Sequence, residues 1–189
     1  MLKVGITGGI GSGKSVICRL FSMLGVPVYD SDARAKELIN SDSQLMAAIT
    51  AVFGPQSYLA TGLNREYVAR RVFGNQAMLA RLNGLVHPAV FKDFEAWAQR
   101  QQAPYVIIES AILFESGLTS RLDRTVLVDA PREVRMERAM LRDGVDRESV
   151  ERRMEAQGAD KPPTDHIIDN GGEAMVWPQV IAIDKELRR

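Results

Sequence analysis

Residues 4–21, VGITGGIGSGKSVICRLF, decide the fold of this chain. The first part of the stretch is apolar, contains β-branched residues and is bounded by glycine, which is typical of a buried strand. The last part has apolar residues at helical spacing, and this spacing continues to Leu24. Gly25 follows, and glycine commonly ends a helix. Residues 8–15 between them match the pattern G-x-x-x-x-G-K-[ST]. This pattern is meaningful when it joins a strand to a helix, as it does here.

The glycine loop is predicted to bind the phosphates of a nucleoside triphosphate. Glycines let backbone N–H groups surround a phosphate, and the helix that follows adds the positive end of its dipole. Lys14 is expected to reach the β- and γ-phosphates, and the Ser15 hydroxyl to bind Mg²⁺. The sequence contains no N-K-x-D guanine-binding motif, so we expect ATP. The other residues expected to bind ATP are Gly8, Gly9, Gly11, Ser12, Gly13 and Val16.

Five short apolar segments predict an α/β fold with a parallel five-stranded sheet. They lie at residues 2–7, 26–29, 105–110, 124–130 and 165–170. Helical segments separate them, which indicates a sheet covered by helices on both faces.

Residues 44–102 differ from the rest, because they hold several amphipathic helical pieces and no convincing strand. We expect a helical insert there, with its aromatic residues in a core. The nucleotide-binding core would then comprise residues 1–43 and 103–189.

Composition limits the possible partners and the compartment. Lys and Arg together number 24, and so do Asp and Glu, so no net charge favours nucleic acid or an anionic membrane. A single cysteine, Cys18, excludes an internal disulfide and fits a reducing compartment. No apolar run reaches the roughly 18 residues of a membrane span, and no signal peptide precedes the first strand. These features predict a cytoplasmic protein and leave its oligomeric state open.

Two aspartates follow the second predicted strand in the sequence YDSD, residues 29–32. The carboxyl ends of neighbouring parallel strands open at the same edge of a sheet, so Asp30 and Asp32 are expected near the phosphate loop. A carboxylate at that place can orient an attacking hydroxyl and accept its proton. The alternative for Asp32 is that it caps the helix expected to start near Ala33.

Two further carboxylates end apolar strands. Glu109 ends YVIIE and Asp129 ends TVLVD, and each resembles the carboxylate that supports the Mg²⁺ shell in phosphoryl-transfer sites. The sequence leaves the choice between them open.

Seven arginines occur within residues 132–153, and Arg135, Arg138 and Arg142 share one stripe of a helix. Arginine binds phosphate in a planar, bidentate manner, and a lid that carries arginines can stabilise the charge of a transferred phosphoryl group. Residues 132–157 are therefore predicted to form a helical lid. The alternative is an ordinary solvated face, on which nearby glutamates neutralise the arginines.

Taken together, the motifs resemble those of the dephospho-CoA kinase family over residues 3–172. The resemblance rests on ITGGIGSGKS, VYDSDARAKEL, LNGLVHPAV, ESAILFESGL, RAMLRDG and HIIDNGG, which occur in the family's order. It implies a fold like that of nucleoside monophosphate kinases, with a helical CoA-binding insert and a lid. It also implies transfer of the γ-phosphate of ATP to the ribose 3′-hydroxyl of dephospho-CoA, the last step of coenzyme A synthesis.

The resemblance also implies roles for individual residues. Asp32 matches the general base, Lys14 the phosphate-binding lysine, and Arg142 or Arg138 a lid arginine that stabilises charge. His87 and Pro88 match a turn, L-V-H-P, that faces the acceptor. From the residues alone, His87 is instead interpreted as a histidine at a helix junction.

One motif departs from the family pattern. Glu109-Ser-Ala-Ile-Leu113 stands where the family usually has Asp-x-Pro-Leu-Leu. Glu109 keeps the charge on a longer side chain, which weakens its assignment to the acceptor site and the metal. Two other functions fit a phosphate loop: a kinase for another small molecule or nucleotide, and an ATP-binding switch that catalyses no transfer.

Overall fold

The computed structural model describes residues 1–157 and 163–189, which divide into two compact units. The first unit comprises residues 1–30 and 101–189, and the second comprises residues 31–100. The second unit begins at Ser31, ahead of the predicted start at residue 44, because the helix α2 (Ser31–Ser41) packs on other helices of the insert. Within the described residues, no helix is both long and apolar enough to cross a membrane.

The first unit is built on a five-stranded parallel sheet with the strand order β2-β5-β1-β6-β7. Its strands are β1 (Leu2–Thr7), β2 (Val28–Asp30), β5 (Tyr105–Glu109), β6 (Arg124–Asp129) and β7 (His166–Asp169). All four neighbouring pairs are parallel. The five apolar segments of the sequence therefore form the predicted sheet.

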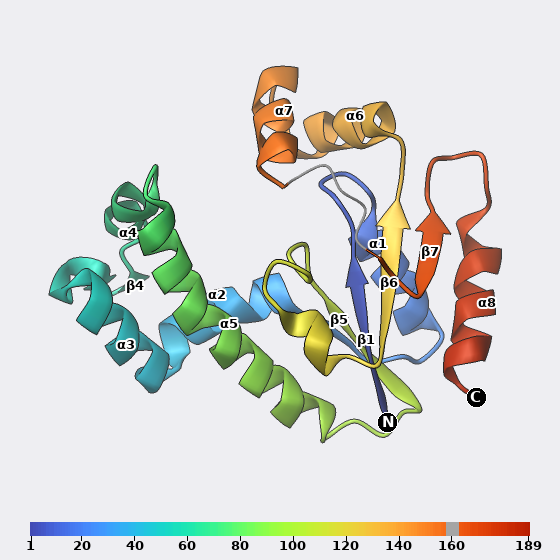
Figure 1. The fold of residues 1–189 in the computed structure, drawn as a ribbon, viewed down its shortest axis with the longest axis horizontal. Helices are drawn as coiled ribbons and strands as arrows, with labels where there is room; N and C mark the ends of the chain where they lie inside the picture. Colours follow the sequence, from blue (N-terminus) through green and yellow to red (C-terminus); the bar gives the residue numbers. More distant parts are fainter. Residues whose placement is uncertain (158–162) are drawn as a thin grey trace. The chain divides into compact units, whose positions relative to one another are not determined.

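Two helices cover one face of this sheet, α1 (Lys14–Met23) and α8 (Val176–Leu187) (Figure 1). Apolar side chains of both helices form one core with alternate strand residues, because successive residues of a strand point to opposite faces. Among the buried members are Val4, Ile6, Ile17, Phe21, Ile107, Val126, Val128, Ile168, Val180 and Ile183.

The opposite face near β1 is covered differently from the prediction. A β-carbon added to Gly5 would meet the side chains of Leu113 and Leu122, so residues 110–122 pack there. This crossover consists of turns and a short 3-10 helix, η2 (Leu118–Arg121), and not of an α-helix. Leu113 and Leu118 are buried and supply the apolar cover that a helix was expected to give.

Two more helices, α6 (Arg132–Asp143) and α7 (Arg147–Ala156), follow β6 and form the expected helical pair. Gly144 ends α6 in the left-handed conformation with φ 64°, and Asp146 caps α7 by accepting from the Ser149 N–H at 2.8 Å. Met136, Ala139, Val150 and Met154 form a separate small core between the two helices.

The second unit is mainly helical. Its helices are α2, α3 (Ser43–Phe53), α4 (Arg65–Val72) and α5 (Gln76–Ala98), with a short 3-10 helix, η1 (Pro55–Ser57). Asp42, Asn64 and Asn75 accept hydrogen bonds from backbone N–H groups at the starts of α3, α4 and α5. These caps explain why the helices begin where they do.

Two predictions for this unit were wrong. A two-stranded antiparallel hairpin, β3 (Tyr58–Leu59) and β4 (Gly62–Leu63), lies in a segment expected to have no strand. The L-V-H-P segment is not a turn, because α5 continues through Pro88 as one helix. Proline removes one helical hydrogen bond, and the packing of a 23-residue helix offsets that loss. Val90, Phe91 and Phe94 are buried as expected, and Trp97 stacks on Phe94 with 6.1 Å between ring centroids.

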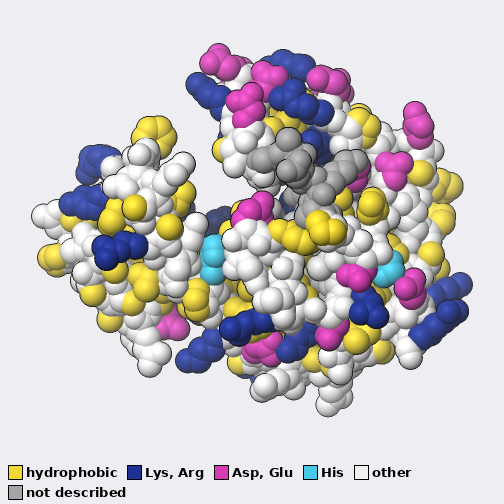
Figure 2. All heavy atoms as spheres, in the orientation of Figure 1, with side chains coloured by type: hydrophobic (Ala, Val, Ile, Leu, Met, Phe, Trp, Pro, Cys, Tyr) yellow, Lys and Arg dark blue, Asp and Glu magenta, His cyan; other side chains and the backbone are white. Residues whose placement is uncertain are grey.

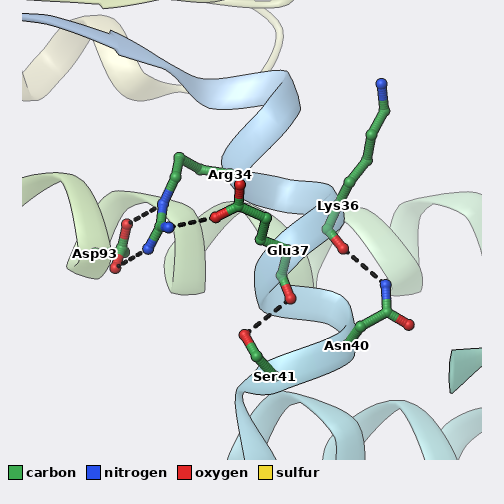
Figure 3. A network of polar contacts seen from close by, with 6 residues as sticks. All are labelled: Arg34, Lys36, Glu37, Asn40, Ser41 and Asp93. Atoms are coloured by element: carbon green, nitrogen blue, oxygen red, sulfur yellow. Dashed lines mark hydrogen bonds and ion pairs between the residues drawn. The ribbon is translucent and has the colours of Figure 1, made fainter.

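An ion-paired network joins α2 to α5 (Figure 3). The guanidinium of Arg34 donates two hydrogen bonds to the carboxylate of Asp93, at 3.0 and 2.9 Å, and also contacts Glu37. A bidentate contact of this kind fixes the orientation of both side chains.

Candidate functional site

The phosphate loop, residues 8–13, connects β1 to α1, and steric contacts require its glycines. Gly11 and Gly13 have φ of 76° and 92°, in the left-handed region that glycine adopts without strain. A β-carbon on Gly8 would collide with the backbone oxygen of Val128, and one on Gly13 with the Asn170 side-chain nitrogen. Neighbouring elements therefore approach the loop too closely for any other residue type.

Polar side chains of the loop fit an anion. The Lys14 ammonium donates to the backbone oxygen of Gly8 at 2.8 Å, so it lies over the amino end of the loop. Ser12 is buried, and its hydroxyl has no hydrogen-bond partner among the described residues. Because a buried polar group without a partner is costly, this hydroxyl suits a site that receives phosphate oxygens.

Ser15, on the first turn of α1, meets a carboxylate at the end of β5. Its hydroxyl donates a 2.9 Å hydrogen bond to Oε1 of Glu109. Asp30 is the register partner of Glu109 on β2, so two acidic residues end neighbouring strands beside the loop. Burial, and next the charge of Glu109, raise the pKa of the Cys18 thiol well above its usual range.

Asp129 and Asn170 lie where β6 and β7 end. The backbone N–H of Asn170 donates to the backbone oxygen of Asp129 at 2.8 Å. The Asn170 side chain donates to the backbone oxygen of Ser12 at 2.7 Å. Its own backbone oxygen accepts a 2.9 Å hydrogen bond from Arg138. Asn170 therefore ties the phosphate loop to β6, β7 and α6, a role that the motif HIIDNGG alone did not reveal.

The expected lid arginines have different surroundings. Arg138 is held by Asn170, whereas Arg142 is exposed and pairs with its neighbour Asp143 at 2.7 Å. Arg153 of α7 joins the same carboxylate, and both guanidinium groups lower the pKa of Asp143. Figure 2 shows acidic and basic side chains mixed over α6 and α7, at the top of the view. Much of the arginine run is thus neutralised locally, as the alternative interpretation expected.

Gln157 is a loop contact that the sequence gave no reason to select. Its side-chain oxygen accepts a 2.8 Å hydrogen bond from the backbone N–H of Ile10, and its side-chain nitrogen lies 3.5 Å from the backbone oxygen of Ala111. A lone glutamine after a helix carries no recognisable pattern. Only the folded chain brings it to the loop.

Three of the expected acceptor-site residues belong to the helical unit. Asp32 lies in the first turn of α2, which begins at Ser31 and not near Ala33, so Asp32 does not precede the helix as a cap. A carboxylate in the first turn interacts favourably with the helix dipole. His87 is half-buried in α5, and burial lowers its pKa, while Pro88 is exposed.

The residues present fit a magnesium ion that is shared with phosphates. Within residues 1–157 and 163–189, no group of three or more His, Cys, Asp or Glu side chains is placed to hold a metal alone. Magnesium in kinases commonly uses one or two protein oxygens and takes its remaining ligands from water and phosphate. The Ser15 hydroxyl and the Glu109 carboxylate supply such a pair.

A comparison with protein families matches residues 2–175 to the family described as dephospho-CoA kinase. The chain belongs to the dephospho-CoA kinase family. The match includes the phosphate loop, YDSD, the helical unit, the helices α6 and α7, and HIIDNGG.

Curated members of the dephospho-CoA kinase family are similar at the sequence level. A dephospho-CoA kinase of Porphyromonas gingivalis is 44% identical over 134 residues, 71% of this chain and 66% of the relative. One from Salinibacter ruber is 42% identical over 135 residues, 69% of this chain and 68% of the relative. The chain thus spans about two thirds of the length of these curated relatives.

Solved structures confirm the fold expected for a dephospho-CoA kinase. TT1252 from Thermus thermophilus has a TM-score of 0.83 at 34% identity, covering 98% of this chain and 97% of that protein. Dephospho-CoA kinase from Campylobacter jejuni has a TM-score of 0.64 at 21% identity, covering 98% and 96%. Shikimate kinase from Aquifex aeolicus, with a TM-score of 0.52 at 21% identity, shares the fold.

Proposed function

We propose that this chain transfers the γ-phosphate of ATP to the ribose 3′-hydroxyl of dephospho-CoA, producing coenzyme A and ADP. The family match over residues 2–175 carries the proposal, because it includes the donor loop and the acceptor motifs together. The loop geometry supports a triphosphate donor, since Lys14, Ser12 and Ser15 lie within or beside one glycine-lined turn.

On the donor side, Lys14 would bind the β- and γ-phosphates, and backbone N–H groups of residues 8–16 would hold the phosphate chain. Ser15 and Glu109 would hold Mg²⁺, supported by their hydrogen bond. When bound, the ion neutralises charge on the β- and γ-phosphates. Asp129 is the alternative to Glu109 as the carboxylate that would support the coordination shell of Mg²⁺.

On the acceptor side, Asp32 would accept the proton of the 3′-hydroxyl as that oxygen attacks the γ-phosphorus. Its place supports this role: it follows the last residue of β2 by two positions, and that residue pairs with Glu109. The residues that would bind dephospho-CoA are Asp30 and Glu109, at the ends of β2 and β5, and His87 and Pro88, in the helical insert that would bind CoA.

The helices α6 and α7 would act as a lid, with Arg138 and Arg142 stabilising the charge that develops during transfer. The left-handed Gly144 between the two helices and the exposure of Arg142 support movement of this arginine. A small-molecule acceptor and a cytoplasmic location complete the proposal, the latter supported by the free, buried Cys18.

The test is phosphate transfer from γ-labelled ATP to a panel of acceptors: dephospho-CoA, AMP, CMP and shikimate. We expect label in coenzyme A alone, and loss of that label in Lys14→Ala. Transfer to a different member of the panel would identify another small-molecule kinase. ATP binding without transfer to any acceptor would indicate a switch.

A further inference from the structure

The seven arginines of residues 132–153 differ in the hydrogen-bond and ion-pair partners of their guanidinium groups. Six have a polar partner in the structure. Arg132 donates to Glu151, Arg138 to the backbone oxygen of Asn170, Arg142 and Arg153 to Asp143, and Arg147 to Glu133, while Arg152 forms an ion pair with Glu148. Arg135 is the exception. In the part of the chain that the structure describes, its Nε is buried and has no hydrogen-bond partner.

The fold places Arg135 directly against the phosphate loop. The strands β1 and β6 are paired, with Thr7 opposite Leu127, so the loop after β1 and the helix after β6 leave the sheet side by side. The guanidinium nitrogen Nη1 of Arg135 occupies the space that a β-carbon on Gly9 would take. The backbone oxygen of Arg135 likewise occupies the space that a β-carbon on Gly11 would take. The first turn of α6 is therefore in contact with two loop glycines.

Lys14 lies at the same end of the loop. Its ammonium donates to the backbone oxygen of Gly8, the residue before the glycine that Arg135 touches. Two cations thus flank the loop's amino end, and no carboxylate within residues 1–157 and 163–189 forms an ion pair with Arg135. Since the chain as a whole has no net positive charge, this local arrangement is what can attract a polyanion.

We propose that Arg135 binds the outer phosphates of the nucleoside triphosphate, as a second cation beside Lys14. A guanidinium carries five N–H donors in a planar fork that matches two phosphate oxygens, and burial makes each unused donor costly. Phosphate oxygens supply the acceptors that the described protein does not. This proposal rests on one part of the proposed function, namely that the loop binds a nucleoside triphosphate.

The decisive variant is Arg135→Met, because methionine retains much of the length and packing of the arginine stem and removes the charge. Arg132→Met is the matched control, since Arg132 lies on the same helix and pairs with Glu151 away from the loop glycines. Binding of ATP, of inorganic tripolyphosphate and of dephospho-CoA would be measured by calorimetry on the full chain. No measurement requires turnover, so the result is independent of which acceptor is phosphorylated.

We expect Arg135→Met to weaken ATP and tripolyphosphate about tenfold or more, while Arg132→Met binds as the wild type does. Arg135→Lys should recover part of the loss because it restores the charge without the fork. Wild-type affinity in Arg135→Met would overturn the proposal. A loss of affinity for ATP alone would also overturn it, because it would indicate a contact with the adenosine. A loss of affinity for dephospho-CoA alone would overturn it as well, because it would indicate a contact with the diphosphate of the acceptor. If Arg135→Met also lowers the melting temperature of the free protein, the affinities of Arg135→Lys decide between a structural role and phosphate binding. The proposal is then overturned if Arg135→Lys binds ATP and tripolyphosphate no more tightly than Arg135→Met does.

Discussion

The hydroxyl of Ser15 donates a 2.9 Å hydrogen bond to the carboxylate of Glu109. Ser15 lies in the first turn of α1 and Glu109 ends β5, and 94 positions of sequence separate them. The parallel pairing of β1 with β5 brings them together, since Ile6 lies opposite Glu109 just before the phosphate loop. The proposed magnesium site therefore depends on strand order as much as on the loop motif.

Glu109→Gln is expected to lower kcat about 10²-fold and to raise the Mg²⁺ concentration needed for half-maximal rate. The amide still accepts from Ser15 but no longer carries the charge that favours the cation. A magnesium titration of the initial rate checks this. Glu115→Gln, an exposed residue beyond the same strand, serves as the control. If the magnesium requirement of Glu109→Gln is unchanged, Asp129 would be the carboxylate that supports Mg²⁺ instead. Asp129→Asn would then be tested in the same way.

Cys18 predicts a dependence of stability on pH. Burial raises the pKa of its thiol in the folded protein, so the unfolded chain loses this proton first, near pH 8.5. Stability is therefore complete below that pH and declines above it, by up to about 1.4 kcal/mol per pH unit. Denaturant unfolding at pH 7.5 and 9.5 measures the decline. The decline should be smaller in Cys18→Ala, and an equal decline in both proteins would show that Cys18 is not its source.

Asp32→Asn tests whether Asp32 is the general base or only a residue of the first turn of α2. Asparagine retains hydrogen bonding at a helix start but cannot accept a proton at neutral pH. We expect kcat to fall roughly 10²-fold or more with nearly unchanged ATP affinity. Steady-state kinetics with ATP titrated separately measures both. Turnover close to wild type would leave Asp32 as a helix-start residue only.

Asn170→Ala should weaken ATP binding several-fold by releasing the Ser12 carbonyl from its 2.7 Å anchor. The backbone oxygen that accepts from Arg138 remains, so the effect isolates the loop contact. Equilibrium titration of ATP measures the change. Gln179→Ala is the control, because its amide bonds to the backbone of neighbouring Asp169 and not to the loop. Equal effects of the two variants would exclude a specific role for Asn170.

The Arg34–Asp93 pair is expected to stabilise the helical unit through its bidentate contact (Figure 3). The two side chains are 39% and 21% exposed, which limits the expected coupling to about 0.5–1 kcal/mol. A double-mutant cycle of alanine variants in denaturant unfolding measures it. The more exposed pair Arg70–Glu66 should give less. A larger coupling at Arg70–Glu66 would contradict the assignment.

Local patterns were sufficient for the sheet and for the donor loop. Short apolar runs predict the five strands, because strands of this kind are buried. Glycines at fixed spacing predict the loop, because its conformation depends on interactions within a few residues. The same rules misjudged residues 110–122 and Pro88. There, packing of Leu113 and the length of α5 outweighed local propensity.

The sequence by itself determined a triphosphate loop on a parallel sheet and the identity of the chain's family. Only the tertiary structure decided that Asn170, Gln157 and Arg135 contact that loop, and that Asp143 holds Arg142. The physical reason is distance along the chain: such contacts depend on which strands pair and how helices pack, and no local periodicity encodes them.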